Sequence, residues 1–350
     1  MKCGKRRNGF PAGLRPGEFE KASTEAQNDD MTMQATNHKV AFLFPGQGSQ
    51  AVGMGKELAE KFPIAKRSFE EADEALGYEL SRVCFEGPEE KLRLTEITQP
   101  AILTVSVAAC RVLAERGVKP DFVAGHSLGE YSAHVAAGTF SFADAVRTVR
   151  QRGKYMQEAV PVGVGAMAAI LGMELQKVTA VCHDAAHGEV CEPANINSPE
   201  QIVISGNSAA VERAAALAEQ RGAKKARLLP VSAPFHCSLM KPAQDRLAVD
   251  LNGIEFRNPN VPVACNVDAE IVKDGDTGRD ALIRQVTGAV KWEQCVRLLL
   301  EHRVQTFVEV GPGKVLWGLM RQIDRHASGL YVNDEASLEK AVGHFAHVKA

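Results

Sequence analysis

The chain has 350 residues, of which 45% are hydrophobic and 24% are charged, and its formal net charge is −2. These values are those of an ordinary globular protein, so they exclude collagen-like structure and disorder along the whole chain. The nearly neutral charge argues against a protein that binds nucleic acid by bulk electrostatic attraction, and without a run of eighteen apolar residues the sequence predicts no transmembrane helix.

The first 38 residues differ in composition from the rest. They are polar, they lack the apolar stretch of a secretory signal, and five acidic residues between positions 18 and 30 argue against an organelle transit peptide. We expect residues 1–38 to be a disordered extension, or to follow from an upstream start codon, with natural initiation near Met31 or Met33. The ordered protein is expected to begin near Lys39.

Four short apolar runs predict buried strands, and helical patterns separate them. The runs are 40–44, 122–124, 261–265 and 306–310. Parallel strands need a long crossover connection, usually a helix, so this alternation predicts an α/β fold with a parallel sheet. We assign the larger domain to residues 39–161 and 233–345.

The stretch between these two parts has an order of its own. It reads as strand, helix, two strands, helix and strand, over residues 165–171, 174–186, 192–196, 201–205, 207–222 and 225–231. This β-α-β-β-α-β order is the ferredoxin-like one. The sequence therefore predicts a ferredoxin-like subdomain at 162–232, inserted into the larger domain.

Ser127 lies at the centre of Gly125-His126-Ser127-Leu128-Gly129, between a predicted strand and a helical pattern over 130–137. The G-x-S-x-G motif in this context is typical of a nucleophile elbow, a sharp turn that exposes the serine oxygen above the sheet. The N–H of Leu128 lies at the start of the helix, where the helix dipole favours developing negative charge. We therefore predict that Ser127 is a nucleophile.

A serine nucleophile needs a base, and His236 is the first candidate. It follows the last strand of the predicted subdomain, close to a proline, where a loop residue can be directed at a site. His126 is adjacent to the serine, but neighbouring side chains on a sharp turn diverge. The spacing identifies no acidic partner for the histidine.

Arg152 lies within the apolar stripe of a helix that the capping-box-like start at Ser141 predicts. A guanidinium directed inward must be paired, because burying it alone is prohibitively costly. One hypothesis is a structural ion pair or an arginine whose head reaches solvent. The other is a bidentate clamp for a substrate carboxylate, facing the pocket of Ser127.

A glycine loop, Gly46-Gln47-Gly48, follows the first predicted strand. With Ala51 it formally satisfies the dinucleotide pattern G-x-G-x-x-A, but no strand ending in an acidic residue follows about 20 residues later, as that fold requires. We interpret the loop instead as the source of a second backbone N–H, that of Gln47, for an oxyanion hole.

Seven segments together resemble malonyl-CoA:acyl-carrier-protein transacylases and the related acyltransferase domains of fatty-acid and polyketide synthases. The resemblance covers about residues 39–345. The segments are Phe44-Pro45-Gly46-Gln47-Gly48-Ser49-Gln50, Thr98-Gln99-Pro100-Ala101, Gly125-His126-Ser127-Leu128-Gly129-Glu130-Tyr131, Arg152-Gly153, Pro234-Phe235-His236, Arg284-Gln285 and Glu309-Val310-Gly311-Pro312-Gly313-Lys314.

The resemblance implies an α/β-hydrolase-like core with a ferredoxin-like insert, and a role for each site residue. Ser127 would become malonylated, and His236 would act as base and then as acid. A main-chain carbonyl, expected at Gln285, would orient this histidine in place of an aspartate. Gln47 and Leu128 would supply the oxyanion-hole N–H groups.

The resemblance also implies how the substrate is selected. Arg152 would bind the free carboxylate of malonate. In related polyketide domains a phenylalanine before the histidine and a small apolar residue after the serine accompany malonyl rather than methylmalonyl substrates. Phe235 and Leu128 fit this pattern, and Phe235 would narrow the space beside the malonyl α-carbon.

The implied reaction is ping-pong transfer of a malonyl group from malonyl-CoA to the phosphopantetheine thiol of acyl carrier protein, feeding fatty-acid synthesis without a metal or other cofactor. The scattered cysteines indicate reduced thiols, so we expect a cytoplasmic protein. We expect a monomer that binds neither nucleic acid nor membrane. A basic cluster is a candidate dock for the acidic carrier protein; it consists of Arg221, Lys224, Lys225 and Arg227.

Three alternative functions remain open on the same residues. The first is an acyltransferase of a polyketide pathway, and the second is a serine thioesterase or hydrolase. The third is a nonenzymatic subunit that keeps the fold and binds acyl carrier protein. An inward arginine favours the transferase over an esterase of neutral acyl groups, which has no use for a buried cation.

Overall fold

The computed structural model describes Met1, His38–Val231 and Ala233–Val348. The prediction of a disordered extension over residues 1–38 lies outside the described residues, apart from its two end positions. From Lys39 onward the chain forms one compact unit, which contains every helix and strand among the described residues.

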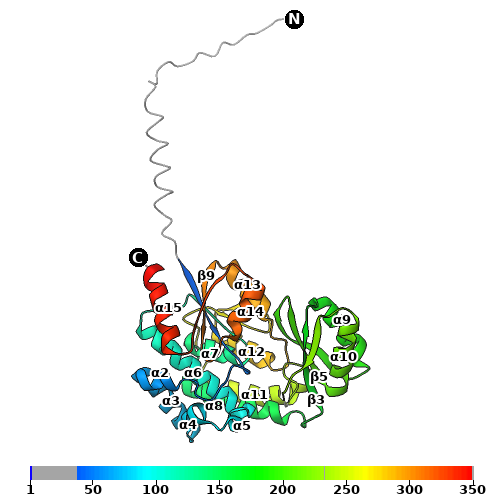
Figure 1. The fold of residues 1–350 in the computed structure, drawn as a ribbon, viewed down its shortest axis with the longest axis horizontal. Coiled ribbons are helices and arrows are strands. Elements are labelled where there is room, and N and C mark those ends of the chain that lie inside the picture. Colours follow the sequence, from blue (N-terminus) through cyan, green and yellow to red (C-terminus); the bar gives the residue numbers. More distant parts are fainter. Residues whose placement is uncertain (2–37, 232, 349–350) are drawn as a thin grey trace. The chain divides into compact units, whose positions relative to one another are not determined.

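The larger sheet has six strands. They are β1 (Lys39–Phe44), β2 (Phe122–Gly125), β7 (Val263–Ala264), β8 (Ile271–Val272), β9 (Val304–Val310) and β10 (Ser328–Val332). Their order is β10-β9-β1-β2-β7-β8, with β1 and β2 in the interior. Figure 1 shows β1, in blue, beside β9. All pairs are parallel except β7 with β8, which is antiparallel. The predicted α/β fold with a parallel sheet is confirmed, with one antiparallel edge.

Helices cover both faces of this sheet, and the side chains of β1 show why. Val40, Phe42 and Phe44 belong to one buried cluster, and the intervening Ala41 and Leu43 belong to another. Successive strand residues point to opposite faces, so an apolar run without alternation requires apolar cover on both sides. The first cluster includes α6 (Thr95–Glu115), α7 (Leu128–Ala136) and α8 (Phe142–Glu158), and the second includes α13 (Trp292–Glu301) and α14 (Val315–Ile323).

Helix α6 is long and apolar enough to cross a membrane by length and composition alone. In the folded chain, however, 83% of its apolar stretch is buried inside the protein. It packs against α8 and α3 (Pro63–Leu76), and its residues lie in the larger core cluster. A helix that is apolar on all sides is expected at such a central position of a globular core.

A second sheet has four antiparallel strands. They are β3 (Gly165–Leu171), β4 (Cys191–Ser198), β5 (Gln201–Asn207) and β6 (Lys225–Leu228), in the order β4-β5-β3-β6. One face packs on α9 (Leu175–Ala186) and α10 (Ser208–Gln220) around its own apolar cluster. On the opposite face Met167, Ala169 and Val203 join the core of the larger part. The element order is the one predicted for residues 162–232.

The remaining helices are α2 (Lys56–Lys61), α4 (Leu80–Glu86), α5 (Glu89–Leu92), the 3-10 helix η1 (Ser238–Met240), α11 (Lys241–Asn252), α12 (Gly275–Gln285) and α15 (Glu335–Val348). Sequence patterns predict no element beyond about Leu338, whereas α15 continues there. The predicted strand 261–265 is shorter, because Pro262 has no N–H to donate to a ladder. The strand predicted over 225–231 likewise ends at Leu228, two residues before Pro230.

Candidate active site

Ser127 occupies a sharp turn between the end of β2 and the start of α7. Its φ of 52° and ψ of −107° lie in a region that non-glycine residues seldom adopt. A Cβ at Gly125 would lie 1.9 Å from the carbonyl of Gly129, and a Cβ at Gly129 would lie 2.0 Å from the carbonyl oxygen of Phe44. Gly125 therefore lets the turn close onto the start of α7, and Gly129 lets it press against β1. This sharp turn directs Ser127 outward.

His236 lies on the loop between β6 and η1, and its ring faces the serine. Its Nε2 is 2.7 Å from Oγ of Ser127, and its Nδ1 is 2.9 Å from the main-chain oxygen of Gln285. A carbonyl oxygen only accepts, so Nδ1 carries the proton and Nε2 presents its lone pair to the serine. The carbonyl of Gln285 thus lies where the resemblance expects a group that orients the histidine.

Burial keeps His236 in its neutral form. The side chain is 3% exposed, and this burial, reinforced by the positive charge of Arg152, lowers its pKa to about 3. Its hydrogen bond to the carbonyl of Gln285 acts in the opposite direction. A neutral imidazole with a free Nε2 lone pair is the form that a general base requires.

Arg152 is 1% exposed, yet none of the described residues offers it a carboxylate partner within hydrogen-bonding distance. Its Nη1 donates to Oε1 of Gln99 at 2.9 Å, and its Nη2 donates to Oε1 of Gln285 at 2.9 Å. Nη2 also donates to Oγ of Ser127 at 3.1 Å. The acceptors are neutral, so the charge is hydrogen-bonded but not neutralised. The structural ion pair considered from the sequence is therefore absent among these contacts.

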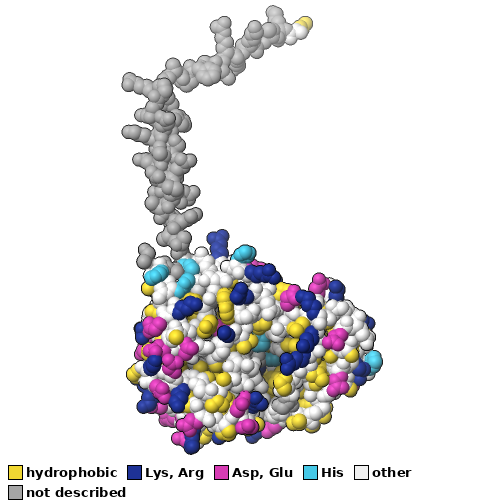
Figure 2. All heavy atoms as spheres, in the orientation of Figure 1, with side chains coloured by type: hydrophobic (Ala, Val, Ile, Leu, Met, Phe, Trp, Pro, Cys, Tyr) yellow, Lys and Arg dark blue, Asp and Glu magenta, His cyan; other side chains and the backbone are white. Residues whose placement is uncertain are grey.

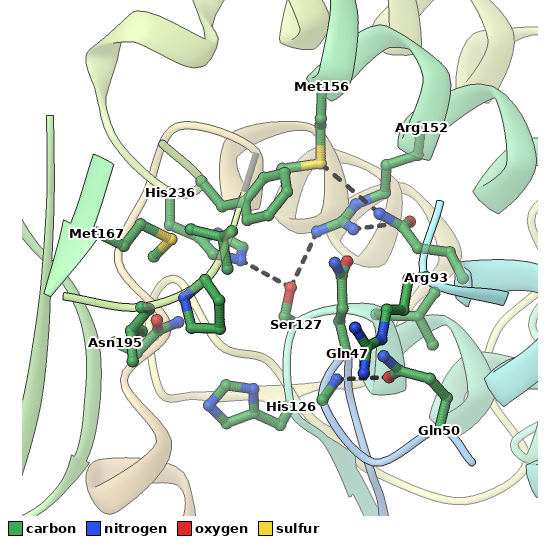
Figure 3. A pocket seen from close by; sticks show the side chains of 17 residues that line it. Gln47, Gln50, Arg93, His126, Ser127, Arg152, Met156, Met167, Asn195 and His236 are labelled. Atoms are coloured by element: carbon green, nitrogen blue, oxygen red, sulfur yellow. Dashed lines mark hydrogen bonds between the residues drawn. The ribbon is translucent and has the colours of Figure 1, made fainter. Parts of the chain in front are cut away.

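These groups line a cavity of about 490 Å³ between the two sheets. Figure 3 shows Ser127 between His236 and Arg152, with Met167 of β3 and Asn195 of β4 on the side of His236, away from Arg152. Phe235 also lines the cavity, as the selectivity prediction requires. The space-filling view shows a hollow between the larger part and the lobe that carries α9 and α10 (Figure 2).

Gln47 and Leu128, the predicted oxyanion-hole residues, both line the same cavity. Leu128 is the first residue of α7, so its N–H has no partner within the helix. The glycine loop lies directly on the elbow, since a Cβ at Gly46 would be 2.4 Å from the main-chain oxygen of His126. The structure thus brings the predicted site residues to the wall of one cavity, with Gln285 in contact directly behind it.

The side chain of His126 diverges from Ser127, as its position on the turn predicts. Its Nε2 lies 2.8 Å from Oδ1 of Asn197 on β4, and its ring contacts the edge of Trp292. Burial lowers its pKa. His126 therefore connects the elbow to the smaller sheet.

A buried polar network lies beneath Ser127, and sequence patterns did not predict it. Asn266 accepts from the N–H of Ser127 at 2.8 Å through Oδ1 and donates to the carbonyl of Gly125 at 2.7 Å through Nδ2. Oε2 of Glu130 accepts from the N–H of Asn266 at 3.0 Å and from Nε2 of Gln285 at 2.7 Å. Glu130 lies within one of the segments that carry the resemblance, and this position could have identified it as part of the site. For Asn266 the only such signal was its place directly after a predicted strand.

Two features outside the cavity bear on the other predictions. Among the described residues no cluster of three or more His, Cys, Asp or Glu side chains could hold a metal ion. In the predicted basic dock, Arg221 pairs with Asp184 at 2.7 Å and Lys224 with Glu200 at 2.9 Å. Half of that cluster is thus already paired within the chain.

Comparison with known families and proteins gives a consistent result. Residues 41–345 match the model of the acyl transferase domain. The malonyl CoA-acyl carrier protein transacylase of Escherichia coli K12 is 51% identical over 303 residues, which are 86% of this chain and 98% of that protein. The transacylase of Bacillus subtilis strain 168 is 50% identical over 305 residues, covering 87% and 96% of the two chains.

Solved structures agree with these relatives. An acyl carrier protein S-malonyltransferase from Vibrio cholerae superposes with a TM-score of 0.85 at 50% identity, covering 87% of this chain and 99% of that one. A malonyl-transacylase solved in complex with a type II polyketide acyl carrier protein superposes with a TM-score of 0.86 at 48% identity and the same coverage.

Proposed function

The chain belongs to the acyl transferase domain family, and we propose that its activity is transfer of a malonyl group from malonyl-CoA to the phosphopantetheine thiol of acyl carrier protein. It is an acyl-carrier-protein S-malonyltransferase, and its product supplies fatty-acid synthesis. The observation that carries this function is Arg152, a buried cation without a carboxylate partner among the described residues, 3.1 Å from the candidate nucleophile. An acyl group with a free carboxylate provides that partner.

In the first half-reaction Oγ of Ser127 attacks the thioester carbonyl carbon of malonyl-CoA, and its proton passes to Nε2 of His236, 2.7 Å away. The N–H groups of Gln47 and Leu128 stabilise the oxyanion of the tetrahedral intermediate. When this intermediate collapses, the C–S bond breaks. The departing coenzyme A sulfur takes the proton from His236, which leaves malonyl-Ser127.

The second half-reaction runs through the same groups in reverse. The phosphopantetheine thiol gives its proton to neutral His236, and the thiolate attacks the carbonyl carbon of the malonyl-serine. Collapse of the second intermediate breaks the C–O bond, and the proton returns from His236 to Oγ of Ser127. Neither half-reaction requires a carboxylate behind the histidine, because the main-chain oxygen of Gln285 receives its Nδ1–H.

The substrate carboxylate also favours proton transfer to His236. The charge of Arg152 contributes to the low pKa of this histidine. An ion pair between malonate and Arg152 cancels that charge, so the imidazolium formed during attack is less unfavourable. A neutral acyl group leaves Arg152 unpaired and the histidine a weaker base, which adds to the selectivity for malonyl.

We further propose an α/β-hydrolase-like domain over 39–161 and 233–345, with a ferredoxin-like insert at 162–232. The strand order β4-β5-β3-β6 with α9 and α10 on one face supports the insert. We propose a cytoplasmic monomer that binds neither nucleic acid nor membrane. Arg221, Lys224, Lys225 and Arg227 remain the proposed dock for acyl carrier protein.

The direct test is the intact mass of the protein after brief mixing with malonyl-CoA, beside acetyl-CoA and the Ser127→Ala variant. We expect one malonyl adduct in the wild type, none in the variant, and little adduct with acetyl-CoA. Addition of phosphopantetheinylated carrier protein should then move the malonyl group to that protein. Free malonate without transfer would indicate a hydrolase, and neither adduct nor turnover would indicate a binding subunit.

A further inference from the structure

Glu130 is a fully buried carboxyl group that the proposed chemistry does not use. It lies on the first turn of α7, and its side chain points beneath the elbow rather than into the cavity. One oxygen, Oε2, accepts from the N–H of Asn266 at 3.0 Å and from Nε2 of Gln285 at 2.7 Å. The other oxygen, Oε1, has no hydrogen-bond partner.

The contact with Glu130 determines which way the amide of Gln285 faces. Nε2 of this amide donates to Glu130 and, at 3.0 Å, to the main-chain oxygen of Ser127. The amide oxygen is thereby turned toward Arg152, where it accepts from Nη2 at 2.9 Å. A reversed amide would place oxygen against the carboxyl oxygen and NH₂ against the guanidinium, so both contacts would become repulsive.

The amide of Gln285 is in turn one of two amides that fix the guanidinium of Arg152. The other is Gln99, which accepts from Nη1 at 2.9 Å. Two acceptors at two different nitrogens define the plane of the guanidinium, and a bidentate interaction with a carboxylate depends on that plane. Without the oxygen of Gln285, Nη2 would keep only its bond to Oγ of Ser127, the atom at which the proposed chemistry takes place.

We propose that Glu130 is a positioning residue for malonyl selectivity, which acts through the amide of Gln285 to orient Arg152 toward the substrate carboxylate. The inference rests on the proposed malonyl transfer. Burial of a carboxyl group is unfavourable, and here it raises the pKa of Glu130 to about 7. An apolar side chain of similar size would avoid that cost but would remove the shared acceptor of the Asn266 N–H and the Gln285 amide, so the contribution of the carboxyl group lies in these two hydrogen bonds.

Two variants separate the hydrogen-bonding role from mere occupancy of space. Glu130→Gln keeps an oxygen that accepts from both N–H groups, and its NH₂ takes the place of the unpartnered oxygen. Glu130→Leu fills a similar volume but accepts nothing. Glu130→Met, with a more flexible chain, replaces the leucine variant if that variant does not fold.

Each full-length variant is assayed with two reagents. Malonyl-CoA reports on both Arg152 and the serine–histidine pair, whereas an uncharged fluorophosphonate reports on the serine–histidine pair alone. We expect Glu130→Leu to lose about tenfold or more in kcat/KM for malonyl-CoA, mainly through KM, because one hydrogen bond to a charged group is lost. Its fluorophosphonate labelling should stay within about threefold of wild type, and Glu130→Gln should stay within about threefold on both reagents.

A double variant tests whether the effect passes through Gln285. If it does, Glu130→Leu combined with Gln285→Leu should be no worse for malonyl-CoA than Gln285→Leu alone. Additive losses, an unchanged kcat/KM in Glu130→Leu, or parallel losses on both reagents would each overturn the inference while malonylation of the wild type stands. A wild type that reacts with fluorophosphonate but never with malonyl-CoA would instead refute the proposed function, and the inference with it.

Discussion

Nη2 of Arg152 donates a hydrogen bond to Oγ of Ser127 at 3.1 Å, so the buried cation and the candidate nucleophile share one end of the cavity (Figure 3). In a malonyl group one methylene separates the thioester carbonyl from the carboxylate. When the thioester carbonyl carbon lies at Oγ, we expect the carboxylate of this short acyl group to reach the guanidinium of Arg152. We expect the guanidinium to exchange its bond to Oγ for one to the substrate carboxylate, which frees a lone pair of Oγ for attack.

Arg152→Ala tests this arrangement. Removal of the charge-assisted pair should lower kcat/KM for malonyl-CoA by about 100-fold, because a hydrogen-bonded charge pair in a buried site contributes about 3 kcal/mol. Reaction with acetyl-CoA should fall much less or increase, since no buried cation then remains unpaired. Steady-state assays of acyl transfer to carrier protein, with malonyl-CoA and with acetyl-CoA, measure the ratio of the two kcat/KM values.

Arg147→Ala is the matched control. Arg147 lies on the same helix, with its side chain 53% exposed and paired with Asp144 on the surface. Its replacement should change kcat/KM for malonyl-CoA and for acetyl-CoA by no more than about twofold, because surface substitutions have small effects. Equal losses for malonyl-CoA and acetyl-CoA in Arg152→Ala would show that the arginine serves the structure of the site and does not select its substrate.

The pH dependence of acylation follows from the environment of His236. Its pKa of about 3 lies below the ordinary value of 6.5, so the imidazole stays neutral as the pH falls through 6.5 and is protonated only near pH 3. We expect no decline centred near pH 6.5 in the rate constant of malonyl-serine formation, measured by rapid quench between about pH 5 and 9.

A second group in the site titrates within that range. Burial raises the pKa of Glu130 to about 7, so a change in this rate constant near pH 7 is assigned to Glu130 when it is present in the wild type and absent in Glu130→Gln. A decline centred near pH 6.5 that persists in this variant would show that His236 titrates as an ordinary exposed histidine. Comparison of this variant with the wild type therefore assigns each inflection to one residue.

The parts of the site that the sequence predicted are those with local signatures. The elbow is defined by a strand, five motif residues and a helix, and the inward direction of Arg152 follows from helical periodicity alone. His236 stands on a loop, so its position made it only the first candidate for the base, and the resemblance strengthened that assignment. The role of the main chain at Gln285 leaves no trace in residue type, because every residue except proline offers the same carbonyl and N–H groups.

The buried network depended on contacts that no local pattern predicts. Asn266 is 139 positions away from Ser127, and the two meet because β7 pairs with β2 in the sheet. Strands β8 and β10 were missed for a similar reason: they are short, and pairing with their neighbours creates them rather than their own propensity. The two edge strands of the larger sheet were therefore missed, whereas all four strands of the smaller sheet were predicted.

The geometry of the elbow predicts that two glycine-to-alanine substitutions will change the free energy of unfolding by very different amounts. Gly129→Ala places a methyl group about where the main-chain oxygen of Phe44 lies, only 2.0 Å from the ideal Cβ, and a strand cannot move to relieve this clash. We expect a loss of at least about 3 kcal/mol in the free energy of unfolding, or failure to fold. Chemical denaturation monitored by circular dichroism measures it.

Gly318→Ala is the matched control, since it adds the same methyl group within α14. Nothing lies within 4 Å of its ideal Cβ, and its backbone is helical. The substitution should stabilise the protein by about 0.5–1 kcal/mol, because alanine favours a helix over glycine. Similar small effects of both substitutions would contradict the close approach of the elbow to β1.

Glu309 lies near the end of β9 and caps α14, the helix that follows this strand in the chain, and this gives stability a pH dependence of its own. The carboxyl group at the end of β9 is buried, and it accepts from the N–H groups of Leu316 at 3.1 Å and Trp317 at 2.8 Å, in the first turn of α14. Glu309→Ala leaves two N–H groups without their acceptor. It should lower the free energy of unfolding by about 2–4 kcal/mol.

The sign of the pH effect follows from burial, which raises the pKa of Glu309 to about 7. Between the unfolded value near 4.5 and about 7 the folded state holds a proton that the unfolded state has lost, so stability falls as the pH rises through this window. Relative to Glu309→Gln, the wild type should therefore be most stable below pH 4.5, where its excess in unfolding free energy is largest. This excess should decrease by up to about 1.4 kcal/mol per pH unit toward pH 7. A difference that grows with pH would mean that the two N–H groups keep this carboxylate ionised in the fold. Denaturant titrations of both proteins across that window distinguish these outcomes.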